Sequence, residues 1–161
     1  MTNHALLSVA CHGYALAALA YLTVLIRPLP LLAWVARGLV GGGLLLHGTA
    51  LVRAYLQTGM FFAGRAEALS AVAFVTLAIF LVMEVGYRRP VIGAFVTPLA
   101  VGVVIPGALY GPQTLGSLLH GPLLAVHVAL AAAGLAAFAV ATGVAGMYLL
   151  MEREAKRKRF G

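Results

Sequence analysis

The sequence contains few charged residues for its length. Only 9% of its 161 residues are charged, and only four of them are acidic. An average soluble domain has about 25% charged residues, so this chain lacks the polar groups needed to cover a surface that faces water. Hydrophobic residues make up 63% of the chain. We therefore expect a membrane protein whose main partner is the lipid bilayer.

Other absences restrict the chemistry. The single cysteine, Cys11, excludes an intramolecular disulfide and a CxxC site. No HExxH motif, paired carboxylates or Ser/His/Asp constellation is present, so we do not expect an enzyme. The net charge of +7 does not indicate nucleic-acid binding, because the positive residues lie in short loops and one C-terminal cluster, as topology signals do.

Long apolar runs dominate what is present. A helix needs roughly 20 apolar residues to cross the hydrocarbon core of a bilayer. Five segments satisfy this requirement, about 6–26, 31–55, 66–85, 91–109 and 122–151, and a basic tail follows at 152–161. They predict an all-α polytopic membrane helical bundle of five transmembrane helices, forming a single transmembrane domain over 1–161.

The distribution of Lys and Arg predicts the orientation of the bundle. Arg53 and Arg65 lie on one side of the predicted membrane. The other side carries Arg27, Arg37, Arg88, Arg89 and the basic tail. The positive-inside rule then places the N-terminus outside and the C-terminus in the cytoplasm, as in a multi-pass protein of the bacterial inner membrane. At the cytoplasmic end of the third helix, Glu84 and Arg88 have the four-residue spacing of a helical ion pair.

Glycine and proline suggest local features of the helices. Gly38 and Gly42, together with the glycine run at 41–43, are expected to let a neighbouring backbone approach the second helix. Pro98 and Pro106 lie inside the fourth segment, which predicts a kinked or partly unwound helix.

The histidines are the main chemical signal. His4 and His120 are expected near water, and His12 is expected to bond to a neighbouring carbonyl. At 1.5 Å per residue, His127 lies about 8 Å and His47 about 12 Å below the outer ends of their helices. An imidazole at such a depth requires a partner, and neutral imidazole is the usual protein ligand of haem iron. The alternative for each is a hydrogen-bonded structural residue.

The surroundings of His127 leave both alternatives open. Ala131 and Gly134 follow it at the four- and seven-residue spacings and share its helix face. Small residues at these positions either admit a partner helix or leave room for a flat ligand.

Three segments carry a resemblance to a known family. The second helix reads LLLHGTALVRAYL, the third begins GRAEALSAVAF, and the last begins LLHGPLLAVHVALAAAGLAAFA. Together they resemble the cytochrome c assembly protein family, the CcsA, CcmC and HemX type of haem-handling membrane proteins. The resemblance covers most of residues 40 to 155. It implies that His127 ligates haem iron on the extracytoplasmic side and that His47 belongs to a deeper haem site within the membrane.

The resemblance also implies a function in cytochrome c biogenesis, in which haem is bound or presented near the outer face of the inner membrane. The family's tryptophan-rich segment and second pair of histidines would lie further along the chain, whereas this sequence has only Trp34, on the cytoplasmic side. We therefore expect either the front part of a longer protein or a short relative that needs other membrane subunits of a cytochrome c maturation system.

Two other functions are compatible with the sequence. The first is a non-catalytic membrane subunit, or a HemX-like regulator, that binds no cofactor. The second is a small transporter, for which the helix with Pro98 and Pro106 is the only indication.

Overall fold

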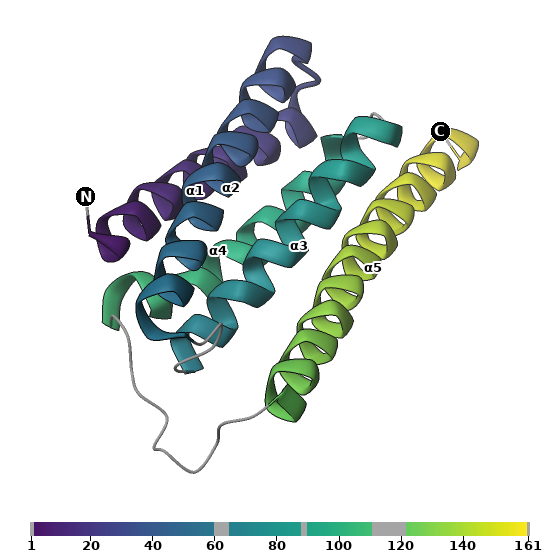
Figure 1. The fold of residues 1–161 in the computed structure, drawn as a ribbon. Coiled ribbons are helices and arrows are strands. Elements are labelled where there is room, and N and C mark those ends of the chain that lie inside the picture. The colour runs from purple at the N-terminus through teal and green to yellow at the C-terminus, as the bar shows by residue number, and fades with distance from the viewer. Residues whose placement is uncertain (1, 60–64, 88–89, 111–121, 161) are drawn as a thin grey trace.

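The computed structural model describes residues 2–59, 65–87, 90–110 and 122–160. All the regular structure in these residues is helical, which confirms the predicted all-α class (Figure 1). The elements are α1 (Asn3–Ile26), α2 (Pro30–Thr58), α3 (Arg65–Tyr87), the short 3₁₀ helix η1 (Pro90–Ile92), α4 (Gly93–Tyr110) and α5 (Pro122–Phe160).

Local sequence explains where the first two helices begin and end. The hydroxyl of Thr2 accepts a bond from the amide of Ala5 and caps α1. Pro30 occupies the first position of α2, where its missing N–H is not needed. Gly59 follows α2 with φ 69°, and its N–H donates to the carbonyl of Tyr55. This left-handed conformation is one that glycine adopts without steric cost, so α2 ends there.

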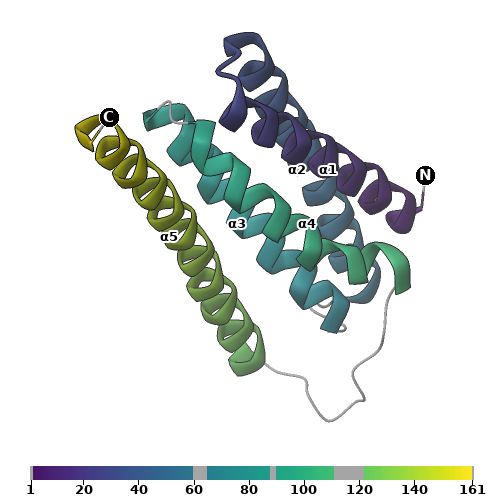
Figure 2. The same cartoon turned by 180° about the vertical axis from the view of Figure 1, so that it is seen from behind.

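The helices form a layered bundle. α1 packs along α2 and against α4, while α3 packs against α4 and α5. Figures 1 and 2 show the same arrangement from opposite sides, with α3 and α4 lying between the α1–α2 pair and α5. The core lies among α1 to α4, and its largest apolar side chains are Tyr14, Tyr21, Phe80 and Leu77.

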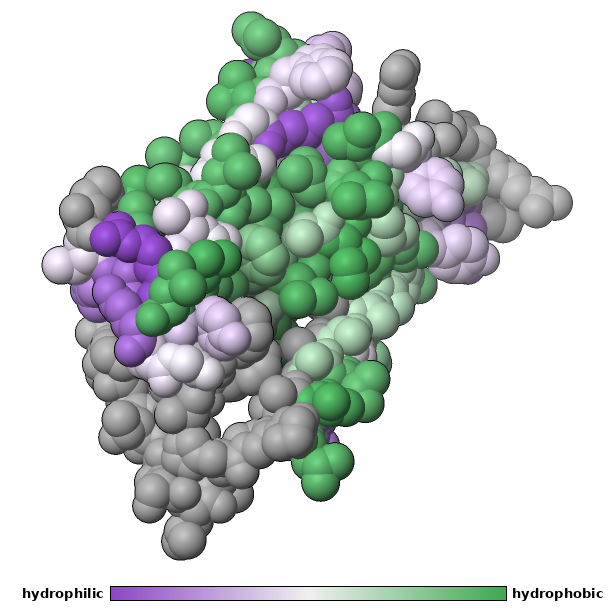
Figure 3. Space-filling view, viewed as in Figure 1, coloured by the Kyte–Doolittle hydropathy of each residue, from purple (hydrophilic) through white to green (hydrophobic). Residues whose placement is uncertain are grey.

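Several helices are long and apolar enough to span a membrane, consistent with a multi-pass membrane protein. These are Asn3–Ile26, Pro30–Thr58, Ala66–Tyr87 and Ala129–Arg153, and the apolar helix Pro90–Ile105 is shorter. Apolar residues cover most of the coloured surface in Figure 3, and hydrophilic ones lie in separate patches. Large exposed apolar side chains occur on all the long helices, as a surface in contact with lipid requires.

The end of the last helix differs from the prediction, and the fourth helix is bent rather than unwound. The last helix was expected to end at about residue 151, but α5 continues to Phe160. Its extension is rich in Glu, Lys, Arg and Ala, which favour helix, and the Glu152 carboxylate lies 2.6 Å from Lys156 Nζ one turn on. α4 is helical throughout Gly93–Tyr110 rather than unwound, and it changes direction in its last part, near whose end Pro106 occurs (Figures 1 and 2).

Candidate functional site

His47 lies in the core between α1, α2 and α3, with none of its surface exposed. Its Nε2 is 2.7 Å from the hydroxyl of Ser70 on α3, and its Nδ1 is 3.3 Å from the hydroxyl of Tyr14 on α1. The ring of Phe74 meets the imidazole edge to face, with centroids 5.5 Å apart. A hydroxyl can donate or accept, so both ring nitrogens have a partner in either tautomer. One imidazole thus connects three helices.

A glycine makes room for this arrangement. A Cβ atom on Gly43 would lie 2.5 Å from Cε1 of Tyr14, so the tyrosine ring rests directly on the α2 backbone. The close approach predicted at Gly38 and Gly42 is wrong, because nothing lies within 4 Å of a Cβ at either position. The backbone of α2 comes within 3.6 Å of the Cβ position of Gly13 on α1 instead. Within the glycine run at 41–43, Gly43 is therefore the residue that allows the close contact with α1.

A cavity of about 140 Å³ adjoins His47. It lies among the start of α1, the end of α2 and the start of α3. His47 and Ser70 contribute to its inner part, while the exposed residues His4 and Gln57 and the half-buried Asn3 line its outer part. The cavity therefore connects a buried polar pair with the end of the bundle at which α1 begins.

His127 lies on α5 and is exposed. Ala131 and Gly134, which share its face, are exposed as well, and nothing lies within 4 Å of a Cβ at Gly134. α5 packs on α3 and α4, which separate it from the α1–α2 pair in both views (Figures 1 and 2). His127 and His47 are therefore not brought together. Among the described residues, no group of three or more His, Cys or acidic side chains is placed to hold a metal ion.

The other histidines have separate positions. His12 is exposed, and its Nδ1 donates to the carbonyl of Ser8 at 2.7 Å, one turn earlier in the same helix. The expected carbonyl partner is thus present. His4 is exposed at the outer part of the cavity, near the surface as expected. His120 lies outside the described residues.

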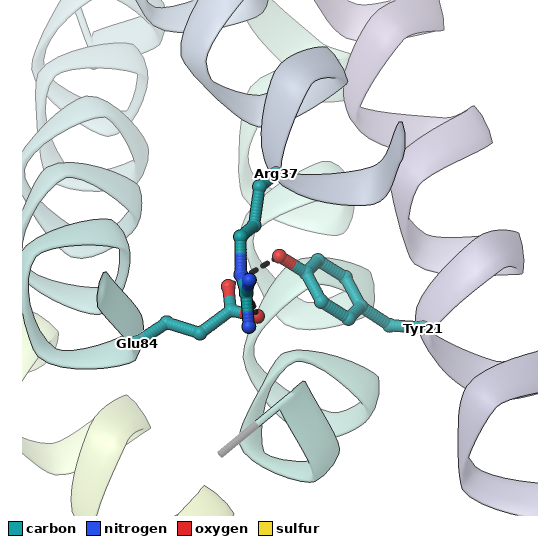
Figure 4. A network of polar contacts seen from close by, with 3 residues as sticks. All are labelled: Tyr21, Arg37 and Glu84. Atoms are coloured by element: carbon teal, nitrogen blue, oxygen red, sulfur yellow. Dashed lines mark hydrogen bonds and ion pairs between the residues drawn. The ribbon is translucent and has the colours of Figure 1, made fainter. Parts of the chain in front are cut away.

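A second polar cluster lies toward the opposite end of the bundle and connects the same three helices (Figure 4). Glu84 on α3 has a fully buried side chain, and its Oε1 lies 3.0 Å from Nε of Arg37 on α2. Its Oε2 accepts a short hydrogen bond from the hydroxyl of Tyr21 on α1. The guanidinium of Arg37 also lies over the ring of Trp34, 4.8 Å from the ring centroid. Both carboxylate oxygens are therefore bonded, and the charge is compensated.

The sequence pattern does not predict this cluster. Glu84 has the spacing of a pair with Arg88, which lies outside the described residues, and Arg37 has the position of a topology signal. The structure gives Glu84 partners that are 47 and 63 residues away. A signal was present, since Arg37 and Glu84 are charged residues within apolar spans, and such residues pair with one another.

The fold and these clusters define the class of protein. The regular structure of the described residues is only helical, several of the helices are apolar and of membrane length, and the buried side chains of His47 and Glu84 bond to side chains of neighbouring helices rather than facing lipid. No protein-family model, curated protein or solved structure matches the chain.

Proposed function

We propose that this chain is a haem-handling integral membrane protein of cytochrome c biogenesis. In this proposal it crosses the bacterial inner membrane five times, α4 included, with its N-terminus outside and its C-terminus in the cytoplasm. It binds or presents haem near the outer face. Other membrane subunits, or a further part of the same protein, complete the haem site.

The charge distribution supports this orientation. Five basic residues gather after Met151, and the first 26 residues contain none. The two termini lie at opposite ends of the bundle, as an odd number of crossings requires (Figure 1). The positive-inside rule then assigns the end with the basic tail to the cytoplasm.

The exposure of His127 is the observation on which the haem proposal depends. An imidazole on the apolar surface of a membrane helix requires a polar or metal partner, and α5 itself provides none in the described residues. Ala131 and Gly134 are small residues on the helix face that carries His127, so a flat macrocycle or a second helix can lie against this face. Neutral imidazole is a usual axial ligand of haem iron. We therefore assign His127 as the first ligand and place the second on a partner helix.

His47 is proposed as a ligand of a separate, deeper haem site, and its geometry is more demanding. Both of its nitrogens already have hydroxyl partners, so iron would have to replace Ser70 or Tyr14. The adjoining cavity of about 140 Å³ is smaller than the roughly 300 Å³ at which pockets for organic ligands begin. Ligation at His47 would therefore require α1, α2 and α3 to separate.

Purification from haem-replete cells tests the proposal. We expect a Soret band in the wild-type protein and its loss or weakening in His127→Ala, because that change removes the iron ligand. The matched control is His12→Ala, which removes another exposed histidine from an apolar helix and should leave the band unchanged. A colourless wild-type preparation, or equal spectra for both variants, would contradict haem ligation by His127.

The alternative function is a membrane subunit or HemX-like regulator without a cofactor. The broad exposed face of α5 favours it, since Leu130, Phe138 and Tyr148 are each more than 60% exposed. In that case the protein co-purifies with a partner through α5. Replacement of Phe138 by Ala then weakens the association, whereas His127→Ala has no effect.

A further inference from the structure

We propose that the cavity beside His47 is a water-filled inlet, through which small water-soluble molecules reach Ser70, the hydrogen-bond partner of His47, from the end of the bundle at which α1 begins. Its volume of about 140 Å³ has room for several water molecules, since each takes about 30 Å³ in the liquid. An apolar cavity of this size would remain dry, so the nature of the lining decides the matter.

The lining contains an acceptor that lacks a partner. Asn3 donates from Nδ2 to Oε1 of Gln57 at 2.8 Å, which fixes the side-chain amide at the outer part of the cavity. Oδ1 of Asn3 is buried and has no hydrogen-bond partner within the described part of the chain. A buried acceptor without a partner is costly, and ordered water is its usual partner in polar cavities. This oxygen is therefore the first anchor for water.

Polar groups continue from this anchor to the inner part. His4 and Glu67 line the cavity together with Asn3, and Ser70 and His47 lie further in. A water molecule needs two to four polar partners. These side chains supply polar partners at the outer and inner parts of the cavity, while apolar side chains such as Leu7 and Leu51 form much of the rest of its wall.

The inlet ends at Ser70. Thr76 on the same helix is equally buried, but its hydroxyl donates to the carbonyl of Val72 at 2.8 Å and does not line the cavity. The two residues therefore have nearly the same exposed fraction, but only Ser70 lines the cavity. This inference does not depend on haem binding, and only its sidedness depends on the orientation proposed above.

Cysteine accessibility tests the inlet. Cys11 is first changed to Ser, which removes the only native thiol, and Ser70→Cys is then added. The probe is trimethylammonium-ethyl methanethiosulfonate, which does not cross membranes. The cysteine thiol loses its proton to water, the thiolate attacks the probe's sulfenyl sulfur, a disulfide forms and methanesulfinate leaves. The matched control is Thr76→Cys in the same background.

We expect Ser70→Cys to react at least about tenfold faster than Thr76→Cys, because thiol reactivity requires access from water. Filling the outer part with Ala54→Leu, a position that lines the cavity, should slow the reaction of Ser70→Cys. If Ser70→Cys does not fold, Ala50→Cys on the cavity wall takes its place. No reaction of the folded variants, or equal rates at Ser70→Cys and Thr76→Cys, would overturn the inlet.

Right-side-out and inside-out vesicles separate this proposal from the proposed orientation. Reaction in right-side-out vesicles supports both the inlet and an outer N-terminus. Reaction only in inside-out vesicles supports the inlet and overturns the orientation.

Discussion

Arg37 Nε lies 3.0 Å from Glu84 Oε1, although the two residues belong to different helices and are 47 positions apart. The other carboxylate oxygen accepts from Tyr21, so α1, α2 and α3 share one buried charge (Figure 4). Few water molecules screen this pair, because the exposed fractions of the two side chains are 14% and 0%. The rotation of three helices about their axes is thereby fixed at one point.

Removing the arginine should destabilise the bundle strongly. Arg37→Met leaves the Glu84 carboxylate buried without a counter-charge, and breaking a buried pair in this way costs about 3–5 kcal/mol. We expect a large fall in the unfolding temperature in detergent, measured by circular dichroism. The double variant Arg37→Met, Glu84→Met should recover much of the loss, because no lone charge remains. If the double variant is less stable than Arg37→Met, lost packing rather than an unpaired charge causes the effect.

The ion pair near the C-terminus should behave differently. Lys156 Nζ lies 2.6 Å from the Glu152 carboxylate, but the side chains are 68% and 39% exposed. Exposed pairs of this kind contribute under about 0.5 kcal/mol and are screened by salt. We expect Lys156→Ala to leave the unfolding temperature nearly unchanged at moderate ionic strength. A loss comparable to that of Arg37→Met would show that the end of α5 has a structural partner.

Neighbouring glycines on α2 should differ in their tolerance of a methyl group. Gly43→Ala places a Cβ 2.5 Å from the Tyr14 ring, so the ring or the helix must shift, and overpacking typically costs about 1–3 kcal/mol. Gly42→Ala is the matched control, since nothing lies within 4 Å of its Cβ and alanine favours helix over glycine. We expect a lower unfolding temperature for Gly43→Ala only. Equal effects at both positions would contradict the proposed contact.

The helices could be predicted from the sequence because an apolar run in a membrane satisfies its backbone hydrogen bonds within itself by forming a helix. The second helix was predicted at about 31–55, and the structure extends it to Pro30–Thr58, because Pro30 and Gly59 set its ends through the local chain. The length of α5 was underestimated because the prediction ended the helix with the apolar run at Met151. Charged residues with high helix propensity continue the same helix to Phe160.

The partners of the buried polar side chains did not follow from the sequence, because they depend on how each helix is rotated about its axis. His47 and His127 both lie in apolar runs, yet one is fully buried and the other is exposed. Gly42 and Gly43 are adjacent, yet only the second meets a neighbouring side chain. Successive residues of a helix are rotated by about 100° about its axis, so neighbouring positions face different surroundings. Which of these faces points into the core is determined by packing between helices.

The two hydroxyl partners of His47 should differ in how much stability their loss costs. Tyr14 is fully buried, so Tyr14→Phe leaves Nδ1 without a partner, a loss of about 1–3 kcal/mol for a buried group. Ser70 adjoins the cavity, so a water molecule can take the place of its hydroxyl in Ser70→Ala. We therefore expect Tyr14→Phe to lower the unfolding temperature more than Ser70→Ala does, although the Ser70 bond is the shorter one, at 2.7 Å against 3.3 Å. The reverse order would indicate that bond geometry dominates and that water does not replace the Ser70 hydroxyl.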